Sequence, residues 1–336
     1  MILVNDVEEQ SIVFLDKFNT TDDPNLNDAL RAAEAHKRIR YNLHKILKPG
    51  CSIREIIKYV ENSTRTLLKG EINNGIGFPC GVSINEVAAH FSLNPWDTDI
   101  FLKETDVLKI DFGTHSNGII IDSAFTVCFD EEKRTLIEAA KEATEAGIKA
   151  VGVDAAVCEI GRDIQEVYRS YEMKDAHGNV SPVKPVWNLN GHSIGRYKIH
   201  AGISIPPINN GDFSRIAEGF VALETFGSTG MGEIKEAGEC SHFMYTKESS
   251  NKIYDKKNEK VLNLIKEKFL TLPFSHQHVD FYENNTKTSV KLLAARKFIE
   301  PYPPLVDIPK SHVAQFEHTI YLKEEHKKVV SRGEDY

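Results

Sequence analysis

Hydrophobic residues recur with helical spacing in two pairs of segments. The first pair covers residues 26–47 and a segment whose apolar face is Ile53, Ile56, Ile57 and Val60, and the second covers residues 135–150 and 154–171. Proline or glycine separates the two members of each pair, and short β-rich runs follow each pair. The order helix, helix, strands therefore occurs twice, which predicts an internal repeat.

A third helical region follows in residues 251–300. This region holds ten Lys or Arg against six Asp or Glu, so it is locally positive in a chain whose net charge is -8. A nucleic-acid surface would explain the local charge, but an elaboration of the molecular surface is the simpler explanation. We expect an inserted segment at the surface.

Composition places the chain among soluble globular proteins. Its 336 residues are 41% hydrophobic and 27% charged, and no run approaches the roughly 20 apolar residues that a membrane-spanning helix needs. The first six residues turn acidic without a basic segment or cleavage site, so they do not predict a signal peptide. The five cysteines are widely spaced without a Cys-x-x-Cys pair, which indicates a reducing compartment and hence the cytoplasm.

The most informative stretch runs from Leu108 to Val127, where two β-rich runs flank the residues His115-Ser-Asn-Gly118. A four-residue loop here predicts a hairpin in which Asp111 lies directly opposite Asp122. Residues that face each other across two strands have Cβ atoms about 4.5–5.5 Å apart. Two carboxylates so placed would repel each other, and more strongly in an apolar environment.

Three explanations of this pair compete. A shifted register would leave both aspartates in solvent, but their neighbours are apolar. Two aspartates sharing a proton, as in aspartic proteases, are a second explanation, but neither stands in an Asp-Thr/Ser-Gly motif. A site for a hard metal ion is the explanation that we favour.

Three further residues are candidate ligands for such a site. His192 has glycines nearby, which let the backbone come close to an ion. Glu224 lies in an apolar strand that should not contain an unpaired carboxylate, and Glu317 alternates with Gln315 and Thr319 on one face of another strand. Taken singly, each has an ordinary alternative role as a hydrogen-bonded or ion-paired residue.

Charge arithmetic indicates the number of metal ions. Four carboxylates and one neutral imidazole carry a total charge of -4. Two divalent cations would therefore bring the net charge of the ligands and ions together to zero. Two-metal centres typically hold their ions about 3.5–4 Å apart. Oxygen and imidazole ligands together suit Co2+, Mn2+, Fe2+ or Zn2+, and the lack of cysteine disfavours a structural zinc site.

The order and contexts of the five candidates resemble the ligand set of the pita-bread metallopeptidases, family M24. Nearly the whole chain is similar to the type 2 methionine aminopeptidases. The matching stretches include residues 77–90, 109–115, 188–195, 223–230 and 315–320.

The resemblance implies an α+β pita-bread (creatinase/aminopeptidase) fold. In this fold, pseudo-twofold helix-helix-strand repeats surround a central curved antiparallel sheet. We therefore expect residues 1–336 to form a single catalytic domain, with the helical insertion of type 2 enzymes at about residues 246–305.

The implied function is that of a metal-dependent hydrolase. It would remove the initiator methionine from nascent proteins when the second residue is small, through a hydroxide that bridges the metals. The five ligands alone would also suit an X-Pro peptidase of the same fold, and a non-catalytic pita-bread binding protein is a further alternative.

The resemblance also assigns roles to the five ligands. Asp111 would chelate one ion, and His192 and Glu224 would bind the other. Asp122 and Glu317 would bridge the two ions, and Glu224 would also act as a proton shuttle.

Histidines and apolar residues complete the implied site. His200 would contact the scissile carbonyl, and His90 would lie near the scissile amide, where fumagillin-type epoxides alkylate members of this family. The positions that match the pocket for the methionine side chain are Phe78, Ile199, His242 and Tyr302.

The implied partners are the N-terminal methionine of nascent polypeptides, fumagillin-type inhibitors and, transiently, the ribosome. Many eukaryotic members contact the ribosome through a long charged N-terminal tail. No such tail precedes the matched region here. We expect a monomer without membrane contact.

Overall fold

The computed structural model describes residues 18–70, 72–175, 178–246, 252–253 and 255–336. The expectation for the first six residues, and the part of the predicted insertion at residues 247–251 and 254, lie outside these ranges. The helices are α1 (Pro24–Ile46), α2 (Ile53–Leu67), the 3-10 turn η3 (Glu131–Lys133), α3 (Arg134–Ala150), α4 (Val157–Ser170), α5 (Lys256–Lys268), α6 (His276–Asp280) and α7 (Lys287–Ala295).

The strands form two principal antiparallel sheets. One has the order β1-β3-β4, with β1 (Asn74–Ile84), β3 (Leu108–Ser116) and β4 (Ile119–Val127). The other has the order β17-β16-β10-β8-β9, and β7 also pairs with β10. Its strands are β7 (Lys184–Pro185), β8 (Gly191–Ile194), β9 (Ser204–Ile205), β10 (Gly219–Ser228), β16 (Val313–Lys323) and β17 (His326–Val329).

Three smaller sheets lie at the periphery. They have the orders β11-β15-β2, β13-β12-β14 and β5-β6. Their strands are β2 (Val87–Ala89), β5 (Glu172–Lys174), β6 (Val180–Pro182), β11 (Lys235–Glu236), β12 (His242–Tyr245), β13 (Phe274–Ser275), β14 (Ile299–Tyr302) and β15 (Leu305–Val306).

Side-chain hydroxyls join the two principal sheets where β4 lies beside β16. Ser123 and Thr126 of β4 donate to the carbonyls of Glu317 and Gln315, at 2.7 and 2.6 Å. The hydroxyl of Thr319 accepts a hydrogen bond from the backbone N–H of Asp122 and donates one to the carbonyl of Asp122. The two sheets therefore act as one continuous curved surface, because these bonds replace the regular ladder between β4 and β16.

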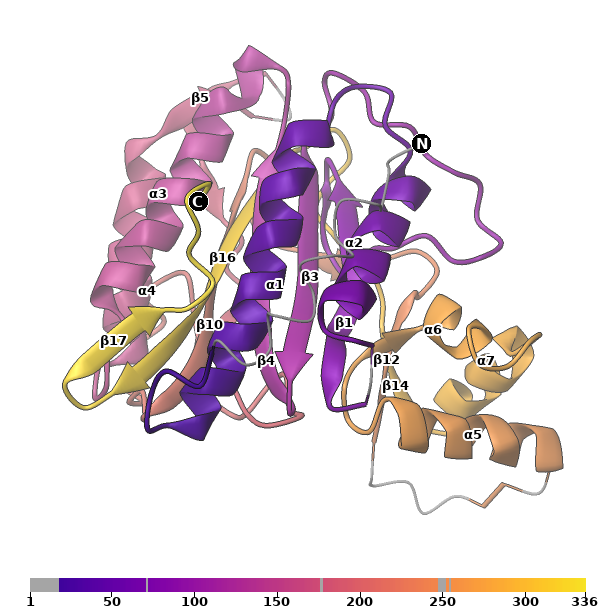
Figure 1. Ribbon diagram of the computed structural model, residues 1–336. Coiled ribbons are helices and arrows are strands. Elements are labelled where there is room, and N and C mark those ends of the chain that lie inside the picture. The colour runs from indigo at the N-terminus through magenta and orange to yellow at the C-terminus, as the bar shows by residue number, and fades with distance from the viewer. Residues whose placement is uncertain (1–17, 71, 176–177, 247–251, 254) are drawn as a thin grey trace.

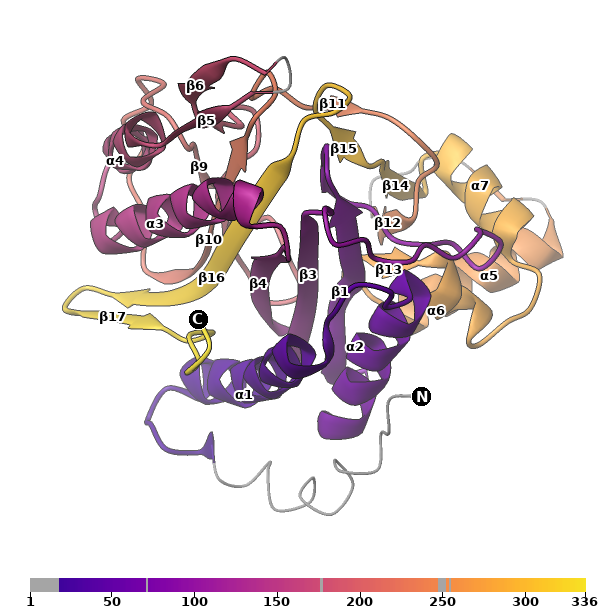
Figure 2. The ribbon, with the colours of Figure 1, turned by 90° about the horizontal axis from the view of Figure 1, so that it is seen from above.

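The predicted repeat is present. Helices α1 and α2 pack on β1, β3 and β4, while α3 packs on β10 and β16 and α4 on β9. Figures 1 and 2 show the two helix pairs on the outer side of the strands, with the orange insertion beside α2 and at the opposite end of the molecule from α3 and α4. The apolar face predicted for α2 is buried, including Ile53, Ile56, Ile57 and Val60. These findings confirm the pita-bread fold.

The predicted register of the aspartate hairpin is wrong. The structure pairs Ser116 with Ile119, so the turn has two residues, and Asp111 faces Ala124 while Asp122 faces Gly113. Two-residue turns that require positive φ angles favour Asn-Gly, and here φ is 47° at Asn117 and 78° at Gly118. The two aspartates still lie on the same face, but as diagonal neighbours rather than direct partners.

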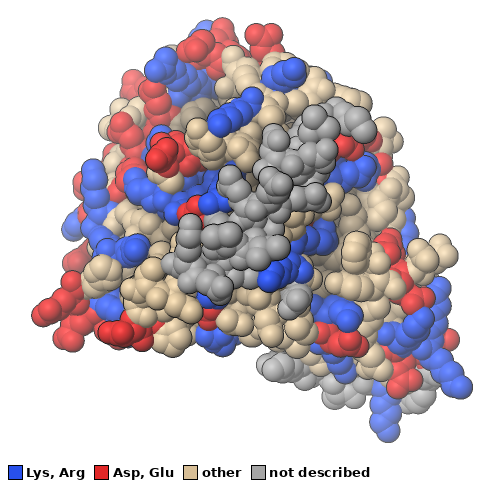
Figure 3. Space-filling model, in the orientation of Figure 1, with Lys and Arg blue, Asp and Glu red and all other residues tan. Residues whose placement is uncertain are grey.

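The inserted region contains more than helices. Three helices, α5 to α7, surround an apolar core of their own together with the sheet β13-β12-β14. A buried hydrogen bond between Glu61 of α2 and His278 of α6, at 2.8 Å, attaches this region to the remainder of the fold. Lys and Arg are mixed with Asp and Glu over the face shown in Figure 3. Among the described residues, no helix is both long and apolar enough to cross a membrane.

Candidate metal centre and substrate pocket

All five candidate ligands come from neighbouring strands and line one pocket. They are Asp111 of β3, Asp122 of β4, His192 of β8, Glu224 of β10 and Glu317 of β16. The empty space in this pocket, open solvent at its mouth included, is about 700 Å³. Positions up to 206 residues apart, from Asp111 to Glu317, are thus brought together by the strand order alone.

Close packing of the backbone places the imidazole. His192 lies on the short strand β8, which pairs with β10. A Cβ atom at the preceding residue, Gly191, would lie 2.7 Å from the carbonyl oxygen of Ala222, so a larger residue would push the two strands apart. The His192 Nε2 atom then lies 3.6 Å from Asp122 Oδ2.

Three of the five residues form a tight cluster. Asp122, His192 and Glu317 each offer one ligand atom, and these atoms all lie within 4.8 Å of one another. The other two, Asp111 and Glu224, are joined through a neutral amide. Gln315 Nε2 donates to Asp111 Oδ2 at 3.2 Å and to Glu224 Oε2 at 3.1 Å.

Several oxygens in this cluster have no hydrogen-bond donor. Within the described part of the chain, Asp111 Oδ1 and both carboxylate oxygens of Glu317 are buried without a partner. Buried carboxylates are normally paired or bound to a metal. These orphaned oxygens, together with one imidazole, fit a divalent cation of the kind that accepts oxygen and nitrogen ligands.

The pKa values of the cluster also favour a metal site. Burial raises the pKa of Asp111 to about 6, and burial with mutual repulsion raises the pKa values of Asp122, Glu224 and Glu317 well above their ordinary range. Burial lowers the pKa of His192 to about 3, so its imidazole is neutral and free to bind a metal. Divalent cations would compensate the negative charge and return the carboxyl groups to their ionised forms.

The histidines expected beside the metals also line this pocket. The rings of His192 and His200 are nearly perpendicular, with centroids 4.4 Å apart. His90 packs edge-on to Tyr302 at 5.8 Å and lies 6.2 Å from His242. Burial lowers the pKa of His90 to about 4 and that of His242 to about 3, so both are neutral near pH 7.

Apolar residues form the rest of the lining. The four positions expected around the methionine side chain, Phe78, Ile199, His242 and Tyr302, all contribute to it. The lining also includes residues that we did not single out from the sequence: Pro79, Gly81, Ala89, Leu189, Phe226 and Pro273. In the sequence they are ordinary apolar or small residues, so no motif or pattern distinguished them as residues of a pocket.

Gln315 was placed on the face of Glu317 from the sequence, but sequence reasoning missed its role. Its amide joins two carboxylates of the cluster, and its side chain is 1% exposed. The alternation along β16, which places Gln315 on the same face as Glu317, was the available signal. A neutral amide in a strand is not anomalous, whereas a buried carboxylate is.

Comparisons with known proteins agree with this geometry. Residues 28–257 match the family model described as metallopeptidase family M24. A relative from Encephalitozoon hellem, named methionine aminopeptidase 2, is 54% identical over 322 residues, which cover 95% of this chain and 90% of the relative. The protein of the same name from Schizosaccharomyces pombe is 43% identical over 92% of this chain and 73% of its own length.

Solved structures with low identity share the fold. A thermophilic Arx1 matches with a TM-score of 0.75 at 16% identity, covering 97% of this chain and 92% of its own. A methionine aminopeptidase from Thermotoga maritima matches with a TM-score of 0.60 at 17% identity, covering 93% of this chain and 98% of its own.

Proposed function

The chain belongs to the type 2 methionine aminopeptidases of metallopeptidase family M24, and from this premise we propose how its own residues carry out the reaction. The protein is a metal-dependent aminopeptidase that removes N-terminal methionine. The observation that carries the proposal is the convergence of four carboxylates and one imidazole, with oxygens that lack hydrogen-bond donors, in one pocket. The X-Pro peptidase and the non-catalytic binding protein are not favoured.

We propose two divalent ions, Co2+, Mn2+, Fe2+ or Zn2+, held by the five residues. Asp111 would bind one ion, His192 with Glu224 the other, and Asp122 with Glu317 would contact both. When bound, such ions lower the pKa of a coordinated water and polarise a carbonyl group. The four carboxylates and the neutral imidazole together match the charge of two such ions.

Protein side chains would carry out the remaining steps of the reaction. The Glu224 carboxylate would accept the proton of the attacking water and pass it to the leaving amine. His200, which lines the pocket, would donate a hydrogen bond to the oxygen of the scissile carbonyl. His90 would lie beside the scissile amide, and the apolar lining would hold the methionine side chain.

Partners and location follow from the same proposal. The substrates would be nascent chains with a small second residue, processed in the cytoplasm by a monomer with transient ribosome contact. Fumagillin-type epoxides would alkylate His90. We treat residues 1–336 as one catalytic domain, with an insertion at about residues 246–305.

The test compares the Asp122→Asn variant with the wild-type protein on a Met-Ala-Ser peptide. We expect the variant to lose turnover and to bind less metal, because Asp122 lies at the centre of the cluster. Unchanged turnover would refute the proposal. An Ala-Pro peptide assayed with the same metal distinguishes an X-Pro peptidase, since the wild-type protein should cleave only the methionine peptide efficiently.

A further inference from the structure

The loop between β8 and β9 makes a tight turn just before two residues of the pocket. The backbone N–H of Gly195 donates to the carbonyl of Lys198 at 2.8 Å, and the N–H of Lys198 donates back at 3.0 Å. Tyr197, the third residue of this turn, has a φ angle of 54°, a left-handed conformation. Turns with a positive φ angle at this position favour glycine. Ile199 and His200, which both line the pocket, follow two and three residues later, so the strained residue lies beside the proposed site.

The hairpin formed by β3 and β4 holds this turn at its tip. The backbone N–H of Tyr197 donates to the carbonyl of Gly118 at 2.7 Å. The Tyr197 ring lies directly on Gly118, where a Cβ atom would come within 2.2 Å of it, and packs edge-on to His115 with ring centroids 5.9 Å apart. The same hairpin carries two of the proposed metal ligands, Asp111 and Asp122.

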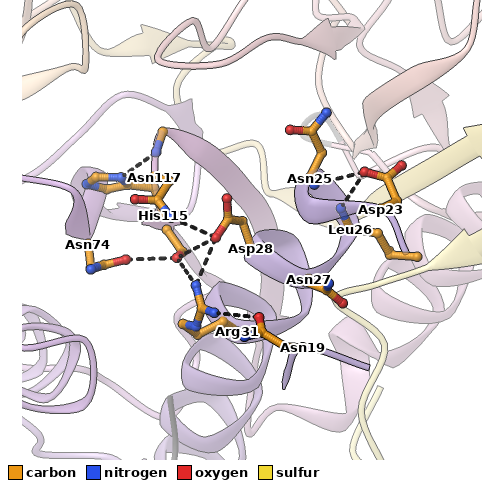
Figure 4. A network of polar contacts seen from close by, with 12 residues as sticks. Asn19, Asp23, Asn25, Leu26, Asn27, Asp28, Arg31, Asn74, His115 and Asn117 are labelled. Atoms are coloured by element: carbon orange, nitrogen blue, oxygen red, sulfur yellow. Dashed lines mark hydrogen bonds and ion pairs between the residues drawn. The ribbon is translucent and has the colours of Figure 1, made fainter. Parts of the chain in front are cut away.

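Arg196, the other central residue of the turn, extends this attachment. Its guanidinium donates to the carbonyl of Asn117 at the hairpin tip and to Asn25 Oδ1 of α1 at 2.7 Å. Asn117 Nδ2 in turn donates to Asp28 Oδ1 of α1 at 2.8 Å (Figure 4). The turn, the hairpin tip and the start of α1 thus form one polar cluster.

The insertion contacts the same tyrosine. Thr271 lies between α5 and β13, and its hydroxyl donates to the carbonyl of Tyr197. Two residues later, Pro273 lines the pocket. The N–H of Tyr197 is therefore bound to the hairpin and its carbonyl to the insertion. A left-handed conformation at a residue with a large side chain persists when neighbouring contacts fix it in this way.

We propose that Tyr197 is a positioning residue, which joins the hairpin to the insertion and thereby fixes His200 relative to the metal ligands. Displacement of a group that contacts the reacting atoms by about 1 Å is enough to slow a reaction strongly. This inference rests on the proposed function, because Tyr197 acts through the contact of His200 with the scissile carbonyl. It gives the insertion a role in the reaction, through the hydroxyl of Thr271.

The first test is kcat for a Met-Ala-Ser peptide, with saturating metal, in the wild-type and His200→Ala backgrounds. Tyr197→Gly removes the ring but suits the left-handed turn, so backbone strain is not the cause of any loss. We expect kcat to fall about tenfold in the wild-type background and about twofold or less in the His200→Ala background, because the ring acts through His200. Equal falls in the two backgrounds, or none in the wild-type background, would overturn the inference.

Tyr197→Phe is the conservative control. It keeps the ring against the hairpin tip and removes only the hydroxyl, which donates to Asn73 Oδ1 at 3.2 Å. We expect its kcat to stay within about twofold of the wild-type value. A loss as large as that of Tyr197→Gly would overturn the role given to the ring.

A second set of variants tests the contact from the insertion. Thr271→Val removes the hydroxyl at nearly constant volume and should lower kcat about fivefold, whereas Thr271→Ser keeps the hydroxyl and should keep kcat. Thr286→Val is the matched control, because the hydroxyl of Thr286 donates to Asp280 at 2.6 Å within the insertion and neither residue lines the pocket. Equal kcat values of Thr271→Val and Thr286→Val would overturn the role of the insertion.

Amide hydrogen exchange tests the contacts without an activity assay. The Tyr197 amide should exchange about tenfold faster in Thr271→Val than in the wild-type protein, and at the wild-type rate in Thr286→Val. In the wild-type protein, exchange of this amide as fast as in an unstructured peptide would overturn the inference even if every variant failed to fold. A wild-type protein that does not cleave Met-Ala-Ser would instead contradict the proposed function, and the exchange rates would still decide whether the turn is held.

Discussion

Glu224 and Glu317 lie directly opposite each other on the neighbouring antiparallel strands β10 and β16. Like charges in this position destabilise a sheet, and these two glutamates also lie near the buried carboxyl of Asp122. The arrangement is therefore unfavourable for the fold by itself. Cations bound between the strands, as proposed, would make it favourable, so the proposed site would gain metal affinity at the expense of stability.

Glu317→Gln should stabilise the metal-free protein and inactivate the enzyme. Burial and repulsion raise the pKa of Glu317, so in the absence of metal its ionised form opposes folding increasingly as the pH rises. We expect unfolding by urea at pH 7, with a chelator present, to show a gain of about 1–3 kcal/mol.

The control is Glu104→Gln, at an exposed position, which should change the free energy of unfolding very little. Activity of Glu317→Gln toward Met-Ala-Ser should fall at least about 100-fold. A variant that is less stable than the wild-type protein without metal would contradict this account of the cluster.

His200→Ala should lower kcat about 100-fold without changing the metal content. His200 is an exposed residue that lines the pocket, with its ring centroid 4.4 Å from that of His192, but it is not among the five proposed ligands. Steady-state kinetics and metal analysis of the same preparation check the prediction. His326→Ala, at an exposed position on β17, should have neither effect. Loss of metal from His200→Ala would show that His200 acts as a ligand instead.

Stability at acidic pH should depend on His36. This residue is fully buried, stacks on Phe112 with ring centroids 3.8 Å apart, and directs Nε2 at the carbonyls of Phe112 and Ser123. Burial lowers its pKa from 6.5 to about 3. Because the folded pKa lies below the unfolded pKa, the contribution of His36 is complete above pH 6.5 and is lost as the pH falls toward 3.

His36→Gln keeps a donor for the two carbonyls but cannot gain a proton. Between pH 6 and 4, with a chelator present, its free energy of unfolding should fall less steeply than that of the wild-type protein, by about 1 kcal/mol per pH unit. Urea titrations at several pH values measure both slopes. Parallel slopes would show that His36 is not the group that titrates.

Gly118→Ala should destabilise the fold by about 1–3 kcal/mol. Gly118 has a φ angle of 78°, and a Cβ atom there would lie 2.2 Å from the Tyr197 ring. Around the same turn, Asp28 of α1 accepts hydrogen bonds from Arg31 and from Asn117, both at 2.8 Å (Figure 4). The turn is thus fixed by its neighbours and cannot relax easily.

Gly152→Ala is the matched control for the turn. A Cβ atom at Gly152 would meet nothing within 4 Å, and its φ angle is not positive. We expect a change of about 0.5 kcal/mol or less in thermal or urea unfolding. Equal effects of the two substitutions would contradict the steric argument at Gly118.

The sequence predicted the helices and the ligand cluster for different reasons. Helices α1 to α4 bury one face each, so their apolar residues repeat with helical spacing and the pattern is visible without a structure. The ligands were visible because carboxylates in apolar strands are anomalous. Their convergence, however, depends on strand order, which no local pattern contains, and it came from family resemblance.

The errors and omissions have physical causes as well. The hairpin register depended on the number of residues in the turn, and the Asn117-Gly118 pair specifies a two-residue turn more strongly than the four polar or glycine residues specify a longer loop. Gln315 was placed on the face of Glu317 but given no role, because neutral polar residues are common in strands. Its role is set by Asp111 and Glu224, partners that are distant in the sequence.

Anomalous X-ray diffraction from crystals grown with Mn2+ tests the central claim most directly. We predict two manganese peaks about 3.5–4 Å apart, both contacted by Asp122 and Glu317, with Asp111 beside one and His192 beside the other. Absence of bound metal among these side chains, in crystals of a protein that cleaves Met-Ala-Ser, would contradict the account.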